Sequence, residues 1–424
     1  MGDPLFDHGV GLAVLVIVIV KVLVAFGALM VSVMLMIWFE RKVISDMQAR
    51  IGPNRAGPWG LLQTLADGIK LFFKEDLLPE RADRTVFKLA PYLSIVPAFL
   101  AFAIVPVGGI VTIAGHTFEL QVADPPIGIL FLLAMSSVSV YGVMLAGGSS
   151  GSKYPLLGSV RASAQMISYE AALGMTVVSV VLITGSLSTR AMVASQAVHV
   201  WDWNLIRLGF VPFVLFLVAI TAELNRPPFD LVEAEQELVG GFHTEYSSIR
   251  FALFFLAEFM NTITMSAIVV TLFLGGPDGP GFHFLTWLWP ILWFLGKTIA
   301  FLFFYVWLRA ALPRLRYDQL MDLGWKRLIP LSLAWLLVVA AVLVDRWWGL
   351  AVAGGLVVAG GLLWRALRVG VERGADASGP PSPAGSTSVG ASGSSGETPP
   401  IAISAGVEGP FPVEGKDALR GVAR

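Results

Sequence analysis

The chain consists mainly of long apolar runs separated by short polar loops. A helix needs about 20 apolar residues to cross the hydrocarbon core of a bilayer. Nine stretches reach or approach that length, at about residues 10–38, 88–109, 127–148, 160–186, 207–223, 250–275, 285–308, 328–345 and 348–366. This pattern predicts an all-α integral membrane protein with about nine tilted transmembrane helices.

The two ends of the chain differ in composition. The first apolar run lacks a basic N-terminal flank and a small-residue cleavage site, and it is too long for the apolar part of a signal peptide. We therefore expect a retained, tilted span. After the last run the chain is rich in Pro, Gly and Ser and cannot bury enough apolar surface to order itself. We predict a polytopic membrane domain over residues 1–368 and a disordered cytoplasmic tail over residues 369–424.

Basic residues are concentrated in alternate loops, which predicts the orientation of the chain, since cytoplasmic loops carry an excess of Lys and Arg. If residues 39–87 lie inside, the outer side holds only Arg190, Arg207 and Arg346. The inner loops then hold Arg41, Lys42, Arg50, Arg55, Lys70, Lys74, Arg81, Arg84, Lys153, Arg161, Arg226, Arg250, Arg309, Arg314, Arg316, Lys326 and Arg327. We expect the N-terminus outside and the C-terminus in the cytoplasm, as an odd number of spans requires.

Composition excludes several kinds of chemistry. With 56% apolar and 14% charged residues, the chain has far fewer charges than a soluble domain. The net charge of −1 gives no bulk attraction to nucleic acid. The absence of cysteine excludes disulfides, cysteinyl iron–sulfur clusters and thiolate metal sites. The five histidines show no ligand-like helical spacing, so we predict no metal site and no haem held by two histidines within the membrane. Any electrons must come from a partner.

The first inner loop predicts a rigid turn followed by an amphipathic helix. Prolines and glycines in GPNRAGPWG fix the turn, which lacks the lysine–hydroxyl pair of a phosphate-binding loop. After the turn, one helical face is apolar, formed by Leu61, Leu62, Leu65, Ile69, Phe72 and Phe73. The other face carries Gln63, Asp67, Lys70 and Lys74. We expect this helix to lie at the membrane surface, where a purely supporting role is the simplest alternative.

The third inner loop is unusually acidic. Five glutamates and one aspartate fall between Glu223 and Tyr246, and a double proline, Pro227-Pro228, ends the helix before them. Glu233 and Glu237 are four residues apart and repel each other if both are ionised. A solvated acidic loop is one interpretation. Against it, apolar residues such as Phe229 and Leu238 interrupt the charges. A low-dielectric cleft in which some carboxyls retain protons is the other interpretation.

Ionisable residues also fall inside the predicted spans. Glu170 and Glu258 lie about eight or nine residues from the inner ends of their spans, and Lys21 and Lys297 lie near mid-membrane. One such residue is readily explained as a structural partner or a snorkelling side chain. Four of both signs, with Glu223 at a span end, indicate a hydrated polar track.

Four inner-loop segments identify a family resemblance. They read ERKVISDMQARIGPNRAGPWGLLQTLADGIKLFFKED, GSKYPLLGSVRASAQMISYE, AELNRPPFDLVEAEQELVGGFHTEYS and LRAALPRLRYDQLMDLGWK. Over about residues 10–345 the chain resembles the quinone-chamber membrane subunit of bacterial respiratory complex I, the NADH:quinone oxidoreductase. The resemblance implies tilted helices around a quinone tunnel, in a bacterial plasma (inner) membrane. It also implies neighbouring membrane-arm and peripheral-arm subunits as partners, with flavin and iron–sulfur clusters only in those subunits.

The resemblance further implies roles for particular residues. Quinone, the substrate, would be bound by Arg41, Arg50, Arg55, Ala66, Asp67, Lys70, Phe229, Asp230, Arg309, Arg314 and Arg316. A proton-linked acidic track would include Glu170, Glu223, Glu233, Glu235, Glu237, Glu245 and Glu258. On this interpretation the chain is a non-redox subunit of a proton-translocating enzyme, and it couples quinone reduction to proton movement.

Other functions fit parts of the sequence. A related membrane-bound hydrogenase, or a dehydrogenase with another electron donor, would use a homologous anchor subunit, and co-purifying partners would distinguish it. A stand-alone ion transporter would use the acidic loop as a cation vestibule and would move ions in liposomes without NADH or quinone. A purely structural scaffold is disfavoured by the carboxylates predicted within the membrane.

Overall fold

The structure is a computed structural model that describes residues 5, 11–113, 116–197, 199–231, 238–280 and 287–377. Within these residues, seven helical segments are long and apolar enough to cross a membrane. They are α1 (Leu12–Met47), α3 (Arg84–Phe102), α4 (Gly128–Ser149), α5 (Lys153–Thr184), α10 (Ser248–Phe273), α11 (Leu288–Ala311) and the segment Tyr317–Val344. Two shorter apolar segments are α8 (Phe210–Glu223) and Arg346–Leu362. Each of the nine overlaps one of the predicted spans, and the all-α membrane class is confirmed.

Shorter elements connect these helices. They are η2 (Pro58–Gly60), α2 (Gln63–Phe73), α6 (Thr189–Ala194), η3 (Val200–Asp202), α7 (Asn204–Arg207), η4 (Gly241–His243), α12 (Tyr317–Leu323), η5 (Gly324–Leu328) and α13 (Ile329–Val344). The last helix, α14, spans Arg346–Ala377. The chain forms two compact units, Met1–Gly361 and Leu362–Arg424, and the description below concerns the first.

A short hairpin, which the sequence analysis did not predict, follows α3. Strands β1 (Ile110–Ile113) and β2 (His116–Glu119) pair antiparallel, with Ile110 opposite Glu119 and Ile113 opposite His116. The predicted span at 88–109 ran past the true end of α3 at Phe102, because the apolar residues continue beyond the helix.

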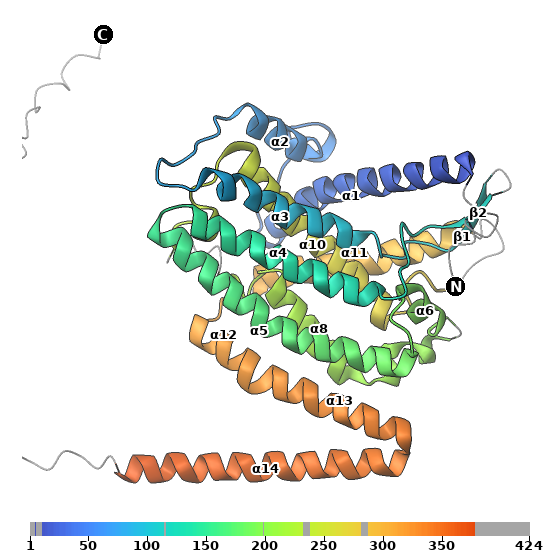
Figure 1. Ribbon diagram of the computed structural model, residues 1–424, viewed down its shortest axis with the longest axis vertical. Helices are drawn as coiled ribbons and strands as arrows, with labels where there is room; N and C mark the ends of the chain where they lie inside the picture. The colour runs from blue at the N-terminus through green and yellow to red at the C-terminus, as the bar shows by residue number, and fades with distance from the viewer. Residues whose placement is uncertain are drawn as a thin grey trace, which may run out of the picture. The chain divides into compact units, whose positions relative to one another are not determined.

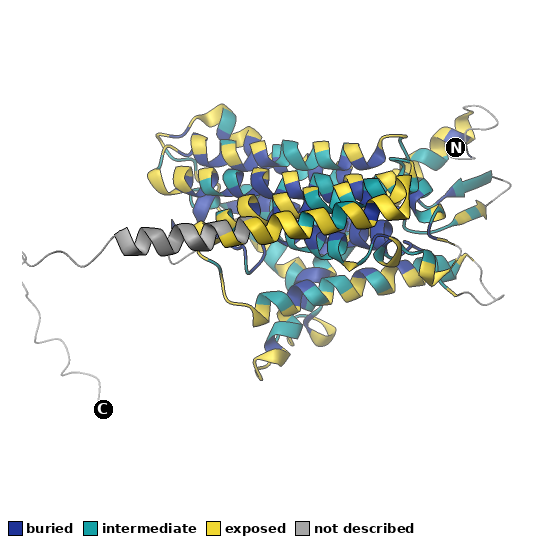
Figure 2. Ribbon diagram, turned by 90° about the horizontal axis from the view of Figure 1, so that it is seen from below, coloured by how far each residue is buried: buried dark blue, intermediate teal, exposed yellow. Residues whose placement is uncertain are grey.

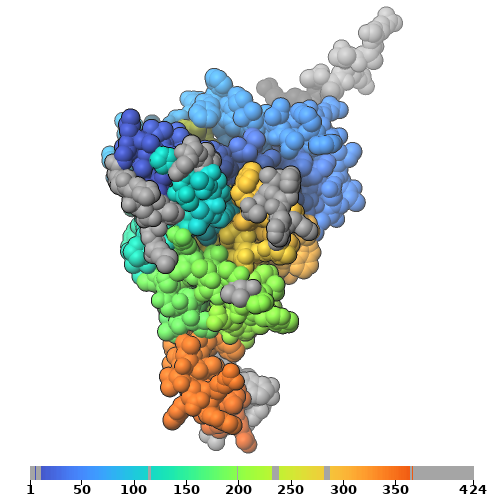
Figure 3. Space-filling view, turned by 90° about the vertical axis from the view of Figure 1, so that its right-hand side faces the viewer, coloured from blue at the N-terminus to red at the C-terminus, as the bar shows by residue number. Residues whose placement is uncertain are grey.

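The loops gather at two ends of the helical bundle (Figure 1). At one end, the Asp83 amide donates to the Ser149 carbonyl, and the Leu77 amide donates to the Ser247 hydroxyl. We call this the inner end, because it holds the loops predicted to be cytoplasmic. At the other, outer end, Arg190 forms an ion pair with Glu119 of the hairpin. Figure 3 looks onto the outer end, where the hairpin and the segment containing α6 and α7 are exposed.

Helix α10 is the most deeply buried of the candidate spans. In its most apolar window 72% of residues are buried, against 11% for α1 and 22% for α11. Helices α1, α3 and α11 all pack against it, and Figure 2 shows buried residues concentrated in the interior of the bundle. A charged side chain on α10 is therefore enclosed by protein rather than by lipid.

Glycines allow α4 to pack closely against its two neighbours. A Cβ on Gly142 would clash with the Ser94 hydroxyl of α3, and one on Gly147 would clash with the Ser159 hydroxyl of α5. Small residues at such crossings let helix backbones approach each other within a membrane. This packing fixes the position of α4 between α3 and α5.

The two lysines of the predicted polar track belong to the outer end. The Lys297 ammonium donates to the carbonyls of Leu274, Gly276 and Asp278 at 2.7, 3.1 and 2.7 Å, and it therefore binds the C-terminal end of α10. Positive charge is favourable at that end of a helix. The Lys21 ammonium lies 5.9 Å from the ring of Phe118 in the hairpin. Both lysines thus have structural partners away from the acidic loop.

Candidate functional site

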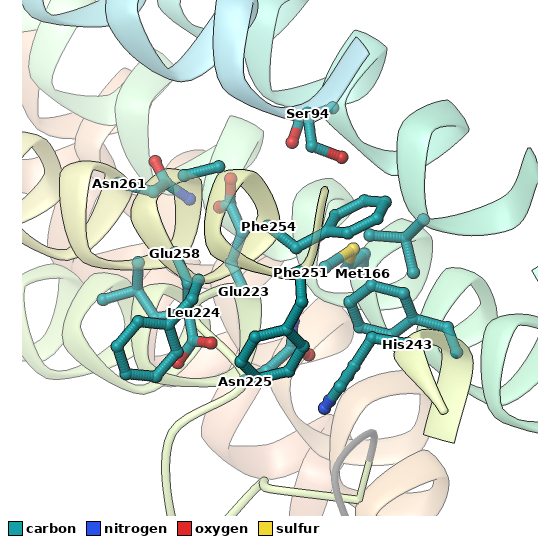
Figure 4. Close-up of a pocket in the computed structure, with 15 residues that line it drawn as sticks. Ser94, Met166, Glu223, Leu224, Asn225, His243, Phe251, Phe254, Glu258 and Asn261 are labelled. Carbon is teal, nitrogen blue, oxygen red and sulfur yellow. The ribbon is translucent and has the colours of Figure 1, made fainter. Parts of the chain in front are cut away.

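A cavity near the inner half of the bundle brings two of the predicted acidic residues together. It contains about 670 Å³ of empty space, including its opening to the surface. Glu223 comes from the last position of α8 and Glu258 from the middle of α10 (Figure 4). The remaining lining residues are Ser94, Ser139, Val143, Met166, Leu224, Asn225, Phe242, His243, Phe251, Phe254, Phe255, Ala257 and Asn261. The cavity therefore has carboxylate and amide groups on a largely aromatic and aliphatic wall.

The aromatic wall is held by a buried tyrosine behind it. The Tyr246 ring stacks on Phe87 with 4.0 Å between centroids and meets Phe254 edge-on at 5.0 Å. Its hydroxyl donates to the Phe87 carbonyl at 3.1 Å. Burial raises the pKa of the Tyr246 hydroxyl to about 12, so the group stays protonated and keeps this hydrogen bond at neutral pH.

Two of the membrane-embedded carboxylates are held by neighbouring serines of α4. The Ser136 hydroxyl donates to Oε1 of Glu223, and the Ser137 hydroxyl donates to Oε1 of Glu170 on α5. Glu170 does not line the cavity. It lies seventeen positions after Lys153, the first residue of α5, because this helix begins seven residues before the predicted span.

A chain of ion pairs joins the cavity to the loop after α11. The Arg226 guanidinium lies 3.3 Å from Glu258 and 3.4 Å from Glu40 of α1. Glu40 also pairs with Arg309, the basic residue in the last turn of α11. The Arg226 and Glu40 side chains are only 6% and 8% exposed, so each depends on the other for compensation of its charge. The Arg226 guanidinium also lies 4.6 Å from the ring centroid of Phe259.

One buried glutamine fixes the turn that presents Arg226. Gln165 of α5 donates from Nε2 to the Ala222 carbonyl at 2.7 Å, to Oδ1 of Asn225 at 3.1 Å and to the Phe229 carbonyl at 3.0 Å. Asn225 has φ of +51°, a left-handed conformation that asparagine tolerates better than most residues. The helix end and the following turn are thereby held to α5.

The residues after the double proline pack against the basic loop. Phe229 is buried beside Tyr169, with 5.5 Å between ring centroids, and it does not line the cavity. Asp230 pairs with Arg314 at 3.0 Å, and the Leu315 amide donates to the Pro228 carbonyl at 2.9 Å. The predicted quinone-site residues Phe229, Asp230 and Arg314 are thus close neighbours.

A second group of predicted residues meets where α1 reaches α2. Arg41 pairs with Asp67 at 2.7 Å, and Lys70 lies 3.9 Å from the same carboxylate. No residue of α2 is buried, and its apolar side is exposed at Leu65, Ile69, Phe72 and Phe73, as an amphipathic surface helix requires. Arg50, Arg55 and Ala66 are exposed nearby, and Arg316 pairs with the exposed Asp318.

The remaining predicted acidic residues lie within or next to residues 232–237, a segment outside the described residues. Glu233, Glu235 and Glu237 lie outside the described residues. Glu245 is half-buried after η4 and lines no part of the cavity. Among the described residues, no group of three or more His, Cys, Asp or Glu side chains is arranged to hold a metal ion.

Comparison with known proteins identifies the family. The family model for NADH dehydrogenase matches residues 20–340. The chain belongs to the NADH dehydrogenase family. Relatives named as the H subunit of NADH-quinone oxidoreductase come from Frankia casuarinae and Frankia alni, each 54% identical over 329 residues, which cover 76% of this chain and 72% of the relative. One from Streptomyces avermitilis is 52% identical over 335 residues, covering 77% and 73%. The predicted resemblance to this membrane subunit of complex I is confirmed.

The region that matches the NADH dehydrogenase family contains every candidate residue, and it also contains four that sequence reasoning missed. Glu40 begins the first of the four family segments but was assigned no role. Arg226 was considered only as one of the basic residues of the inner loops. A signal existed for both, because an ionisable residue at the end of an apolar run calls for a partner. Ser136 and Ser137 gave no such signal, since serine is common in membrane helices.

Proposed function

We propose that this chain forms the quinone-binding passage of a proton-pumping NADH:quinone oxidoreductase and couples quinone reduction to proton translocation. It carries no electrons itself and acts as a non-redox subunit. Electrons arrive from flavin and iron–sulfur clusters in partner subunits. We place the passage at the inner end, beside the end of α1, which contacts both α2 and α11. We place the start of the proton route at the cavity beside Glu258.

The observation that carries this proposal is the continuous set of ion pairs from Arg309 through Glu40 and Arg226 to Glu258. Arg309 belongs to the residues expected to face quinone, and Glu258 to those expected to handle protons. Because Arg226 and Glu40 are buried and each is shared between two partners, a change of charge at one end alters the interaction energy at the other. Such a shared network is a physical means of coupling two sites.

The chemistry of the substrate fits the two kinds of surface. A quinone tail requires an apolar passage, and reduction of the headgroup to a quinol takes up two electrons and two protons. Negative charge that appears on the headgroup draws positive side chains toward it. An arginine that moves toward the headgroup leaves its carboxylate partner less well compensated, and that carboxylate then binds a proton more readily.

Photo-crosslinking of the intact complex with a quinone analogue tests the passage. We expect labelled peptides from residues 41–74 and from residues 223–246. Labelling confined to other regions overturns the assignment of the quinone passage. Unlabelled quinone in excess should abolish the signal, which controls for non-specific attachment to the apolar helices.

The proton route is tested by Glu258→Gln and Glu223→Gln in the assembled complex. We expect both variants to assemble and to translocate protons at least about tenfold more slowly, because an amide cannot carry a proton as a carboxyl does. Glu80→Gln, an exposed carboxylate at the same end, is the matched control. Wild-type proton pumping rates in both test variants contradict the proposed route.

A further inference from the structure

Helix α4 carries three serines within four residues, and two of them hold carboxylates from different helices. Ser136 binds Glu223 of α8 and Ser137 binds Glu170 of α5. Ser139 lines the cavity and makes no hydrogen bond to a carboxylate among the described residues. Consecutive residues on a helix are rotated by about 100° about its axis. One helix therefore faces two carboxylates that belong to separate neighbours.

Glu223 depends on Ser136 for its hydrogen bonding. Its side chain is buried, and in the described part of the chain Ser136 is the one donor to the carboxylate. The other oxygen, Oε2, is buried without a hydrogen-bond partner among those residues. A buried carboxylate with a donor on Oε1 and no partner on Oε2 has an oxygen free to hold a proton and a hydroxyl beside it with which to exchange one.

We propose that Ser136 and Ser137 form a hydroxyl relay that transfers protons between Glu223 at the cavity and Glu170 beyond it. This inference rests on the proposed function and names two further residues of the proton route. A hydroxyl accepts a proton on its oxygen while releasing its own, so each serine is unchanged after the transfer. In the proposed transfer, protonated Glu223 gives its proton to the Ser136 oxygen, and Ser136 turns to release its own proton to a bridging water. The water passes one of its protons to the Ser137 oxygen, and Ser137 releases its proton to ionised Glu170, so Glu223 loses one proton and Glu170 gains one.

The relay gives Glu170 a route to the cavity that its own position does not provide. Glu170 is absent from the cavity lining, whereas Glu223 and Glu258 both belong to it. Ser137 also donates to the Leu133 carbonyl at 3.0 Å. Its hydroxyl can therefore rotate between two hydrogen-bond acceptors, this carbonyl and Glu170. The close packing of α4 against α3 and α5 at Gly142 and Gly147 keeps both serines in register with their carboxylates.

The test compares Ser136→Ala and Ser137→Ala with Ser136→Thr and Ser137→Thr in the assembled complex. We expect each alanine variant to lower the rate of proton translocation by about tenfold or more, the effect of losing one hydrogen bond to a charged group. The threonine variants retain the hydroxyl and should regain most of the rate. Ser179→Ala is the matched control and should pump like the wild type, because Ser179 is a buried serine of α5 that donates only to the Met175 carbonyl and does not line the cavity.

Each outcome distinguishes the relay from the wider proposal. Wild-type pumping in both alanine variants, failure of threonine to restore the rate, or an equal loss in Ser179→Ala overturns the relay. Glu223→Gln is measured in parallel. If Glu223→Gln pumps slowly while both alanine variants are normal, the route stands and the relay fails. If Glu223→Gln also pumps normally, the proposed proton route itself is wrong.

Discussion

Two buried charges at the inner end, Arg226 and Glu40, are each shared between two partners of opposite sign. Arg226 lies between Glu40 and Glu258, and Glu40 lies between Arg226 and Arg309. Removing a charge from water costs several kcal/mol, and only a well-placed partner compensates for that cost. This pairing differs from the exposed pair of Arg316 and Asp318, whose side chains are 80% and 72% accessible.

We therefore predict that Arg226→Ala destabilises the chain by about 3 kcal/mol, the lower part of the range for breaking a buried pair. The lower part applies because Arg309 still compensates Glu40. Arg316→Ala should cost no more than about 1 kcal/mol, because its pair is exposed to solvent. Thermal unfolding of the detergent-solubilised complex compares the two variants through their unfolding midpoints. Equal unfolding midpoints for the two variants refute the idea that Arg226 compensates both carboxylates.

At the scale of elements, the nine apolar segments could be predicted because a membrane helix is specified by a run of some 20 residues. The residues at which these helices begin and end could not be predicted from the sequence. Helix α5 begins at Lys153, ahead of the predicted start at 160, because polar residues extend it and its first turns pack against other protein segments. The strands β1 and β2 escaped prediction because β1, which reads IVTI, directly follows a longer apolar run and carries no separate signal.

The candidate site was predictable only in part, for a related reason. Glu170 and Glu258 stand out as charges inside apolar runs, so a single sequence reveals them. The residues that pair with buried charges do not stand out in this way, as Glu40 shows. The bonds from Glu40 to Arg226 and to Arg309 join residues 186 and 269 positions apart. No local pattern encodes such a pairing, which depends on how α1, α10 and α11 pack.

Gln165 offers a prediction at this scale, because one side chain holds the end of α8 to α5. Gln165→Met keeps the volume but leaves the Ala222 and Phe229 carbonyls without its hydrogen bonds, at about 1–3 kcal/mol each. We expect quinone reduction to fall by about tenfold or more, because the turn that positions Arg226 loses its anchor. The measurement is NADH:quinone activity well below the unfolding temperature.

The matched control for Gln165→Met lies at the opposite end of the bundle. Gln121 is also buried and donates to the Ile104 and Ala123 carbonyls and to the Thr189 hydroxyl. Gln121→Met should lower the unfolding temperature by a similar amount and leave quinone reduction unchanged. A loss of activity that merely follows stability in both variants argues against a specific role for Gln165.

At the scale of the whole molecule, the loops sort into two ends that match the distribution of basic residues. The inner end collects the loops predicted to be cytoplasmic, where Arg250 pairs with Asp76 and Arg314 with Asp230. The outer end carries the hairpin, α6 and the Lys297 contacts. Because cytoplasmic loops retain Lys and Arg, we predict that the inner end faces the cytoplasm and the N-terminus lies outside.

The absence of cysteine makes this orientation simple to measure, because each introduced thiol is the only one in the chain. Lys153→Cys places a thiol on an exposed inner-end residue, and His199→Cys places one on an exposed outer-end residue. A membrane-impermeant maleimide should label His199→Cys in right-side-out vesicles and Lys153→Cys in inside-out vesicles. The reverse pattern means that the chain is inserted the other way round. Labelling after detergent treatment controls for thiols covered by partner subunits, since a covered thiol stays unreactive from both sides of the membrane.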